Sequence, residues 1–307
     1  MPFPAQPTLS DLLLRTYRLL EDVPATDSII APIAATPSGG TITIVPNDVT
    51  QWPVGSRMEV DYEVFLVKAN PGTGGPSTVD VQRAYESSYA QAHATGAFAR
   101  RDPRFLKETV LEAINVALND WCSFYFPDMV WDTTTAGTWQ PNRWIYQAPT
   151  DALGIRRVVW QVPGFQRYVD VDHSDLGTYP TSIVASGLGF EVFETIGLPG
   201  TAVQVLVEKR WTNLVNDTDQ ISSDFPQEAD DLVPQGAILY ICGTRMVPRW
   251  RQDEVLFYRE QATPLPTNFD EQWLEAAYKR WYERATQIRA KRVNRIPQKI
   301  YVGNTGL

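Results

Sequence analysis

Two histidines, His93 and His173, are the first candidates for acid–base or metal chemistry, because the chain has no others. Neither has a second metal ligand at the spacing that a helix or loop site requires. The sequence contains no G-x-x-x-x-G-K-[ST] or G-x-G-x-x-G phosphate loop and no G-x-S-x-G nucleophile elbow. The histidines and glycine motifs therefore predict no catalytic centre.

Carboxylates and cysteines lead to the same expectation. Asp170, Asp172 and Asp175 are close in sequence, and we interpret them as solvated loop charges. Cys122 and Cys242 each lie in an apolar helical pattern without a partner at metal spacing, which is typical of small buried side chains. Unpaired cysteines fit assembly in a reducing cytoplasm. We expect a protein that is not an enzyme and that uses no cofactor and no metal.

Charge separates the C-terminal region from the rest of the chain. The window from Lys279 to Lys299 holds eight basic residues and one acidic residue, so it carries +7 and leaves −16 for the rest of a chain whose net charge is −9. Such a basic tail on an acidic body indicates a partner for the tail and argues against a protein that coats DNA. The longest apolar runs are too short to cross a bilayer, and residues 1–10 do not resemble a signal peptide.

The elements expected to position these residues alternate between helical and β patterns. Helices are predicted over 9–23, from Arg104 to Cys122 with Asp102-Pro103 as its start, over 232–246, over 252–261, and from Asn268 or Asp270 to Arg292. Residues 41–83 have β character. Within them a single strand over 58–66 is predicted, with Met58, Val60, Tyr62, Val64 and Leu66 on an apolar face and Glu59, Asp61, Glu63 and Phe65 opposite. Short β runs over 130–215 predict an antiparallel sheet or sandwich.

The most specific stretch of the sequence is residues 41–98, which ends in a pattern over residues 83–97. It resembles a small β-barrel motif of tailed-phage neck and tail proteins, in which Arg-Gly-x-x-Gly-Thr-x-Ala-x-x-His-x-x-Gly-Ala follows a strand that carries a Glu. The matching residues are Arg83, Ala90, His93, Gly96 and Ala97. Ala84, Ser87 and Ser88 replace the Gly, Gly and Thr of the motif, so its turn glycines are missing. We expect Arg83, His93 and Gly96 to be structural, with His93 bonding within the turn.

The order of elements resembles that of phage head-to-tail adaptors, which build rings from helical bundles, and residues 225–233 resemble the loop before a small-residue helix in them. The likeness implies a C-terminal arm that reaches the portal. In this chain the candidate portal-binding residues are Arg292, Arg295, Ile296, Lys299, Ile300, Tyr301 and Val302. Residues 299–302 could add a strand to the partner. The alternatives are a frayed tail, or phosphate contacts with packaged DNA through Arg289, Lys291, Arg292 and Arg295.

These patterns predict an α+β fold, namely a helical bundle with a small N-terminal β-barrel and a larger antiparallel β insertion. The predicted domains are an N-terminal helix and linker (1–40), the barrel module (41–100), the bundle (101–129 and 217–295), a sandwich-like insertion (130–216) and an extended arm (296–307).

The function expected from the resemblance is that of a structural virion protein in the neck. Copies would close into a ring, implied to be a dodecamer, between the portal and a stopper or tail-completion protein, and dsDNA would pass through an acidic lumen without sequence-specific binding. Assembly would take place in the host cytoplasm, with no membrane contact. One alternative is a tail-side stopper or tail-completion protein. Another is a carbohydrate-binding or depolymerising tail module that uses Trp139, Trp144 and Trp160.

Overall fold

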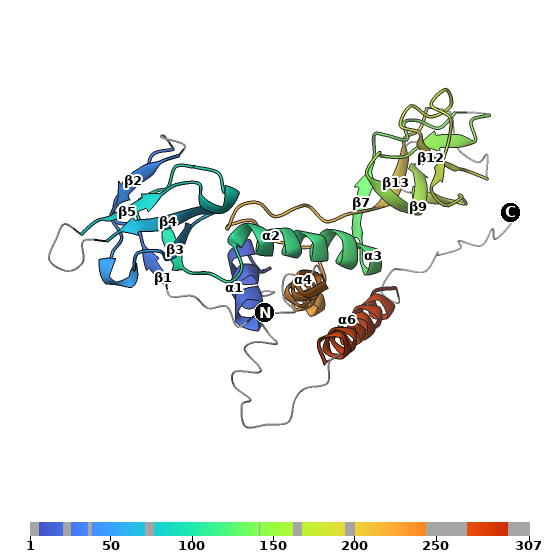
Figure 1. Cartoon of the computed structure of the whole chain (residues 1–307). Helices are drawn as coiled ribbons and strands as arrows, with labels where there is room; N and C mark the ends of the chain where they lie inside the picture. The colour runs from blue at the N-terminus through green and yellow to red at the C-terminus, as the bar shows by residue number, and fades with distance from the viewer. Residues whose placement is uncertain are drawn as a thin grey trace, which may run out of the picture.

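Three separate hydrophobic cores organise the chain, one in a layer of helices and two in β units. The computed structural model describes residues 6–20, 26–35, 39–70, 77–140, 142–161, 168–193, 200–243 and 269–293. The helical layer lies between an N-terminal β unit and a second β unit, so the molecule is elongated (Figure 1).

The N-terminal β unit is one six-stranded antiparallel sheet with strand order β1-β6-β3-β4-β5-β2. Its strands are β1 (Thr26–Ser28), β2 (Thr41–Ile44), β3 (Arg57–Val60), β4 (Glu63–Ala69), β5 (Val79–Gln82) and β6 (Phe98–Arg101). The ends of the edge strands β1 and β2 meet only at an isolated bridge between Ile29 and Pro46. The sheet is therefore curled but is not a closed barrel.

A tight hairpin replaces the single strand that was predicted over 58–66. β3 and β4 pair with each other, and Asp61 and Tyr62 form the two-residue turn between them. Asp61 adopts a left-handed backbone with φ of 53°, which reverses the chain. Glu59 and Glu63, assigned by alternation to the face opposite the apolar one, are 2% and 0% exposed. The predicted division of faces is therefore wrong.

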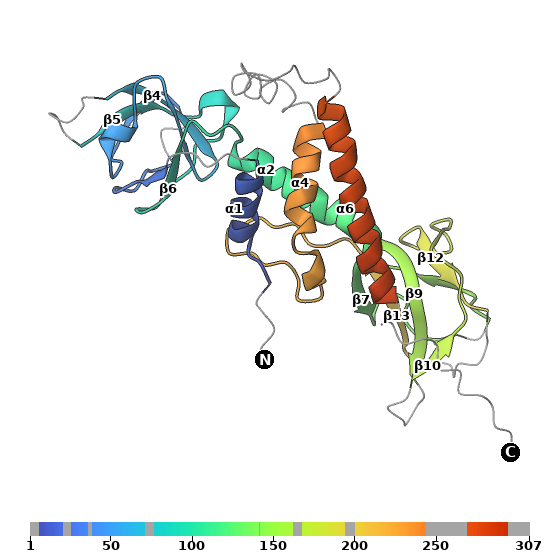
Figure 2. The ribbon, with the colours of Figure 1, turned by 90° about the horizontal axis from the view of Figure 1, so that it is seen from below.

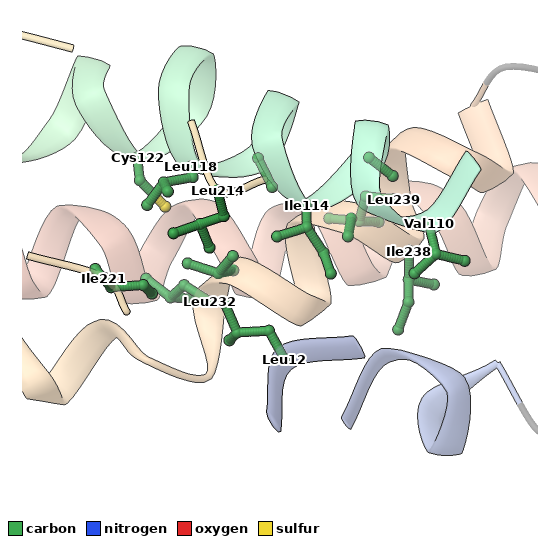
Figure 3. Close-up of a cluster of buried hydrophobic side chains, with 14 of the residues drawn as sticks. Leu12, Val110, Ile114, Leu118, Cys122, Leu214, Ile221, Leu232, Ile238 and Leu239 are labelled. Carbon is green, nitrogen blue, oxygen red and sulfur yellow. The ribbon is translucent and has the colours of Figure 1, made fainter. Parts of the chain in front are cut away.

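The helical layer consists of α1 (Leu9–Leu19), α2 (Lys107–Val116), α3 (Ser123–Tyr125), α4 (Leu232–Gly243) and α6 (Phe269–Val293). α4 is apolar around most of its circumference, as expected for a helix covered on several sides. It lies between α1 and α6 and is crossed by α2 (Figure 2). Residues from all these helices share one core, of which Leu12, Ile114, Leu232 and Ile238 are examples (Figure 3).

α1 begins at Leu9 as predicted and ends at Leu19 rather than at residue 23. Thr8 is the N-cap, and it forms a capping box with Asp11 in which each side chain accepts a backbone N–H from the other residue. The central helix begins at Lys107 rather than near Arg104. Asp102, predicted to start this helix, instead accepts the backbone N–H of Arg57 at 2.7 Å.

A π-helical segment, Ala117–Cys122, joins α2 to α3 and packs against α4 at Gly236. A β-carbon placed on Gly236 would lie 2.9 Å from the β-carbon of Ala117. Glycine is therefore required here for close helix packing, although its backbone is helical.

A buried ion pair joins the N-terminal sheet to the helical layer. Arg100 on β6 donates to Glu59 on β3, and the other oxygen of Glu59 accepts the backbone N–H of Lys107 at 2.6 Å. Lys107 is the first residue of α2, whose own N-cap residue offers no side-chain hydrogen bond. Glu59 therefore supplies the cap of α2 from a neighbouring sheet. Arg100 also lies over the ring of Tyr17 on α1, 4.2 Å from its centroid.

The second β unit comprises a four-stranded sheet, β10-β9-β13-β7, and a three-stranded sheet, β11-β12-β8, both antiparallel. The strands are β7 (Asp128–Asp132), β8 (Ile145–Gln147), β9 (Ala152–Gln161), β10 (Tyr168–Val171), β11 (Gly177–Thr178), β12 (Leu188–Glu191) and β13 (Val203–Lys209). Their shared core includes a stack of Trp139, Tyr146 and Phe190, with ring centroids 5.7 and 6.0 Å apart.

The predicted fold class is wrong. The described residues are rich in sheet, with thirteen strands in three antiparallel sheets and only four helices longer than a single turn. The helices form a crossed layer rather than a bundle, and the N-terminal sheet is not a barrel. The helices predicted near residues 9, 107, 232 and 269 are present, and the helix predicted over 252–261 lies outside the described residues. The crossing of the helices and the closure of the sheet depend on contacts between distant segments.

Candidate functional site

The most highly organised polar site is a cluster of four charged side chains in the N-terminal sheet: Asp61, Glu63, Arg83 and His93. Asp61 lies in the β3–β4 turn and Glu63 is the first residue of β4. Arg83 directly follows β5, and His93 belongs to the irregular segment before β6. The sheet thus brings together side chains that are up to 32 residues apart.

Arg83 and Glu63 form a bidentate pair whose two side chains are both 0% exposed. The Arg83 Nε–Glu63 Oε1 distance is 2.8 Å and the Arg83 Nη2–Glu63 Oε2 distance is 2.7 Å. The guanidinium also donates to the carbonyls of Ala34 and Gln91, while Glu63 accepts the backbone N–H of Gln91 at 3.0 Å. This pair therefore ties β4 to two irregular segments, which suits the planar fork of arginine.

His93 completes the cluster by contacting both acids. Its Nδ1 lies 2.8 Å from Oδ2 of Asp61, and its Nε2 lies 3.0 Å from Oε2 of Glu63. The imidazole is 0% exposed, whereas the side chain of Asp61 is 38% exposed. The backbone of His93 pairs with that of Ile33 through two hydrogen bonds of 2.9 Å, so both the ring and the backbone of this residue are fixed.

The electrostatics of the cluster favour ionised groups. Burial opposes the charge on Glu63, but hydrogen bonds from Arg83, His93 and the Gln91 amide outweigh it and lower the pKa of Glu63 to about 2. A hydrogen bond from His93 lowers the pKa of Asp61. Burial alone would lower the pKa of His93, yet the hydrogen bonds that its ring donates to Asp61 and Glu63 raise it. Both oxygens of Glu63 and Oδ2 of Asp61 accept hydrogen bonds from donors within the protein.

The structure of residues 84–96 shows how this chain accommodates its departures from the phage motif. Ala84, at a glycine position of the motif, has φ of 51°, in the left-handed region that favours glycine. Ser88, at the threonine position, donates to the carbonyl of Val64, and its hydroxyl accepts the N–H of the same residue. Gly96 has φ of 85° and donates its N–H to Ile29 at 2.7 Å. Ala84 thus keeps a glycine-type turn without glycine.

Sequence reasoning placed Arg83, His93 and Gly96 in one structural motif, and the structure brings Arg83 and His93 onto the same carboxylate. Sequence reasoning did not assign Glu63 or Asp61 to this motif, because both were placed on the face opposite the apolar one in a continuous strand. The only pointer was the glutamate-bearing strand of the motif. Gly96 lies outside the charge cluster and supports the turn after His93.

The predicted portal-binding residues lie mostly outside the described residues. This applies to Arg295, Ile296, Lys299, Ile300, Tyr301 and Val302. The backbone of Arg292 belongs to α6. Their role as a portal-binding arm remains a prediction.

An aromatic surface lies where α3 meets α6, and we call it the aromatic ridge. It consists of Trp121, Phe124, Tyr125, Tyr278 and Tyr282. Tyr125 contacts Phe124 and Tyr282 edge to face, with centroids 5.2 and 5.7 Å apart. Phe124 is 70% exposed, Tyr278 49% and Tyr282 47%. Contiguous exposed aromatics of this kind are typical of protein–protein interfaces.

Two of the three tryptophans proposed for a carbohydrate platform are buried. Trp139 and Trp160 are 4% and 6% exposed and belong to the core of the second β unit. Trp144 is 50% exposed. One exposed indole does not make an aromatic platform.

Other candidate groups add no chemistry within the described part of the chain. Cys122 is buried and Cys242 is half-buried, and neither forms a disulfide. Burial raises the pKa of the Cys122 thiol, so the reactive thiolate is disfavoured. No group of three or more His, Cys, Asp or Glu side chains among these residues has the arrangement of a metal site. Among the same residues, no helix is long and apolar enough to span a membrane.

Comparisons with known proteins return no match: no protein-family model fits the chain, and no curated protein matches it.

Proposed function

We propose that this chain is a structural component of a tailed-phage virion, a ring-forming adaptor in the neck that connects the portal to the tail. It carries out no reaction. The observation that carries the proposal is the aromatic ridge, because large aromatic side chains exposed on a folded helical layer are the kind of surface that assembly covers. Copies contact each other head to tail through this ridge and close into a ring, proposed to be a dodecamer.

The charge cluster supports an architectural role for the phage-like motif. Its ionisable groups bond to each other and to the backbone, and the Arg83–Glu63 pair is 0% exposed. The left-handed Ala84, at a glycine position of the motif, supports the resemblance to neck and tail proteins. The resemblance to adaptors in the order of elements gives no support, since the fold is not a helical bundle.

Charge supports the remaining partners. The acidic body suits a lumen through which dsDNA passes without adhering, and the basic C-terminal window suits an acidic surface on the portal. In this proposal Arg292, Arg295 and Lys299 provide charge, and Ile296, Ile300, Tyr301 and Val302 provide the strand that docks on the portal. A stopper or tail-completion protein binds the opposite side of the ring. Assembly begins in the host cytoplasm.

The test is electron microscopy of the purified full-length protein, alone and with portal. We expect closed rings that stack on the portal. Replacing Phe124 and Tyr282 by alanine should leave the circular dichroism unchanged and abolish rings. Phe193→Ala, which changes a 58% exposed phenylalanine in the second β unit, is the matched control and should still assemble. A protein that stays monomeric and binds neither portal nor tail components would contradict the proposal.

The arm is tested separately by deleting residues 296–307. The truncated protein should still form rings, because the aromatic ridge is intact, but its binding to the portal should be lost. Normal docking of the truncated protein on the portal would exclude the arm while leaving the ring proposal standing.

A further inference from the structure

The contacts of His93 define its protonation state. Both ring nitrogens lie within hydrogen-bond distance of carboxylate oxygens, at 2.8 Å from Asp61 and 3.0 Å from Glu63. A carboxylate can only accept, whereas a neutral imidazole has one donor nitrogen and one acceptor nitrogen. Only the doubly protonated imidazolium satisfies both contacts.

The charges around the ring balance in that state. Arg83 and protonated His93 carry two positive charges, and Asp61 and Glu63 carry two negative charges. Loss of the His93 proton would leave a net negative charge in a cluster where three of the four side chains are 0% exposed. An uncompensated charge in such surroundings is costly.

No other charged group of the packed elements replaces that proton. Residues 29–35 contribute only backbone and apolar side chains, and Phe65 on β4 packs edge to face on the imidazole at 5.8 Å. Glu86 pairs with Arg57. Lys107 is near enough to lower the pKa of Asp61, and burial raises the pKa of Tyr62 to about 12, so this phenol stays neutral.

The cluster holds residues 84–97, which we call the latch segment. Gln91 donates to Glu63 and accepts from Arg83, His93 pairs with Ile33, and Gly96 donates to Ile29. The segment contains one 3₁₀ turn and no strand, so these bonds replace regular secondary structure in fixing it. Tyr89 within it is 83% exposed.

We propose that the latch segment is held by a protonation-dependent clamp: His93 is an imidazolium at neutral pH, and loss of its proton loosens the segment from the sheet. Glu63 keeps Arg83 and the Gln91 amide as partners, so the contact that fails is the one to the half-exposed Asp61. The device controls how rigidly the segment that carries the exposed Tyr89 is held on the sheet.

The direction of the pH response follows from the pKa values. Because the pKa of His93 is raised in the folded protein, its contribution to stability is complete below the unfolded value near 6.5 and is lost as the pH rises through the folded pKa. The lowered pKa values of Asp61 and Glu63 act in the opposite sense, since their contributions are lost as the pH falls through the folded values. The clamp is therefore tightest between about pH 4.5 and 6.5.

The experiment is a pH titration of the histidine ring nitrogens by ¹⁵N NMR on the full-length protein. Only His93 and His173 contribute signals, and His173→Gln assigns them and serves as the control. We expect both nitrogens of His93 to remain protonated at pH 7. Hydrogen exchange of residues 84–97, corrected for intrinsic rates, should accelerate by up to about tenfold per pH unit from the unfolded His93 pKa near 6.5 up to the raised folded pKa, and should level off above it.

The variant Asp61→Asn separates the clamp from simple destabilisation. It removes one negative partner at a half-exposed position and should lower the pKa of His93 by about 1 unit. The pH at which exchange levels off should move down by the same amount, while residues 128–209 exchange as before. A neutral His93 ring at pH 7, or exchange of the latch segment that does not follow the His93 titration, would overturn the proposal.

Discussion

The two β units differ in how their interiors are specified. All the charged side chains that are buried in the described residues belong to the N-terminal sheet: Asp27, Glu59, Glu63, Arg83, His93 and Arg100. The second unit buries a stack of aromatic rings, and its pairs Arg156–Glu208 and Arg157–Asp170 are on the surface. The first unit therefore depends on polar partners that must all be present, and the second depends on volume and shape.

The largest expected effect in the N-terminal sheet follows removal of one partner from its buried pair. Arg83→Met keeps most of the apolar stem but removes the bidentate partner of the buried Glu63, which should cost about 3–5 kcal/mol of unfolding free energy. Denaturant titration with segment-resolved hydrogen exchange should place the loss in residues 26–101 and in the helical layer coupled to them, rather than in residues 128–209. Arg157→Met, at a half-exposed pair of the second unit, is the control and should cost at most about 1 kcal/mol. Equal losses of unfolding free energy for the two substitutions would contradict the proposed difference between the two β units.

A comparable loss in the second unit should come from packing alone. Phe190 is 0% exposed and stacks on Tyr146, so Phe190→Ala should cost about 3–5 kcal/mol. The loss should appear in residues 128–209 and should not change between pH 5 and 8, since no titratable group pairs with the ring. A strong pH dependence would show that polar contacts also specify this unit.

A smaller effect is expected at Asp27. Its carboxylate is 8% exposed and accepts hydrogen bonds from Trp52 Nε1 and from the amides of Ser28 and Asp48. Asp27→Asn turns one acceptor into a donor that faces other donors, at a cost of about 1–3 kcal/mol measured by thermal unfolding. Asp80→Asn, at an exposed hydrogen bond of the same sheet, should change stability by no more than about 0.5 kcal/mol.

The smallest expected effect is a gain. Ala84 has a left-handed backbone, so Ala84→Gly should relieve strain and stabilise the N-terminal sheet by about 1 kcal/mol. Ala90→Gly, in the same segment but without a positive φ, should instead lose about 0.5–1 kcal/mol through added freedom of the unfolded chain. A destabilised Ala84→Gly would mean that the strain is absorbed elsewhere.

Local patterns in the sequence predicted the helices better than they predicted the sheet. Val110, Ile114 and Leu118, which belong to the helix predicted from Arg104 to Cys122, lie in the helical core. The alternation over 58–66 predicted one strand where the structure has two, because a two-residue turn reverses the chain without changing the period of two. The turn Asp61-Tyr62 also lacks the glycine or asparagine that usually marks a tight hairpin.

The candidate site was only partly predictable for a related reason. A glutamate in a strand is read as solvent-facing unless its partner is known, and Arg83 is 20 residues from Glu63 while Arg100 is 41 residues from Glu59. The periodicity of a helix or strand in the sequence does not indicate pairs between residues so far apart. The motif likeness gave Arg83 and His93, and the acids they bind came only from the folded sheet.

Glu59 has a consequence for how the chain folds. One of its oxygens holds Arg100 in the sheet and the other holds the first amide of α2, so melting the sheet also removes the cap of the central helix. The N-terminal sheet and the helical layer should therefore gain and lose structure in a single cooperative transition, although their apolar interiors are separate. A substitution near residue 59 should therefore change the fraying of α2 rather than the packing of its side chains.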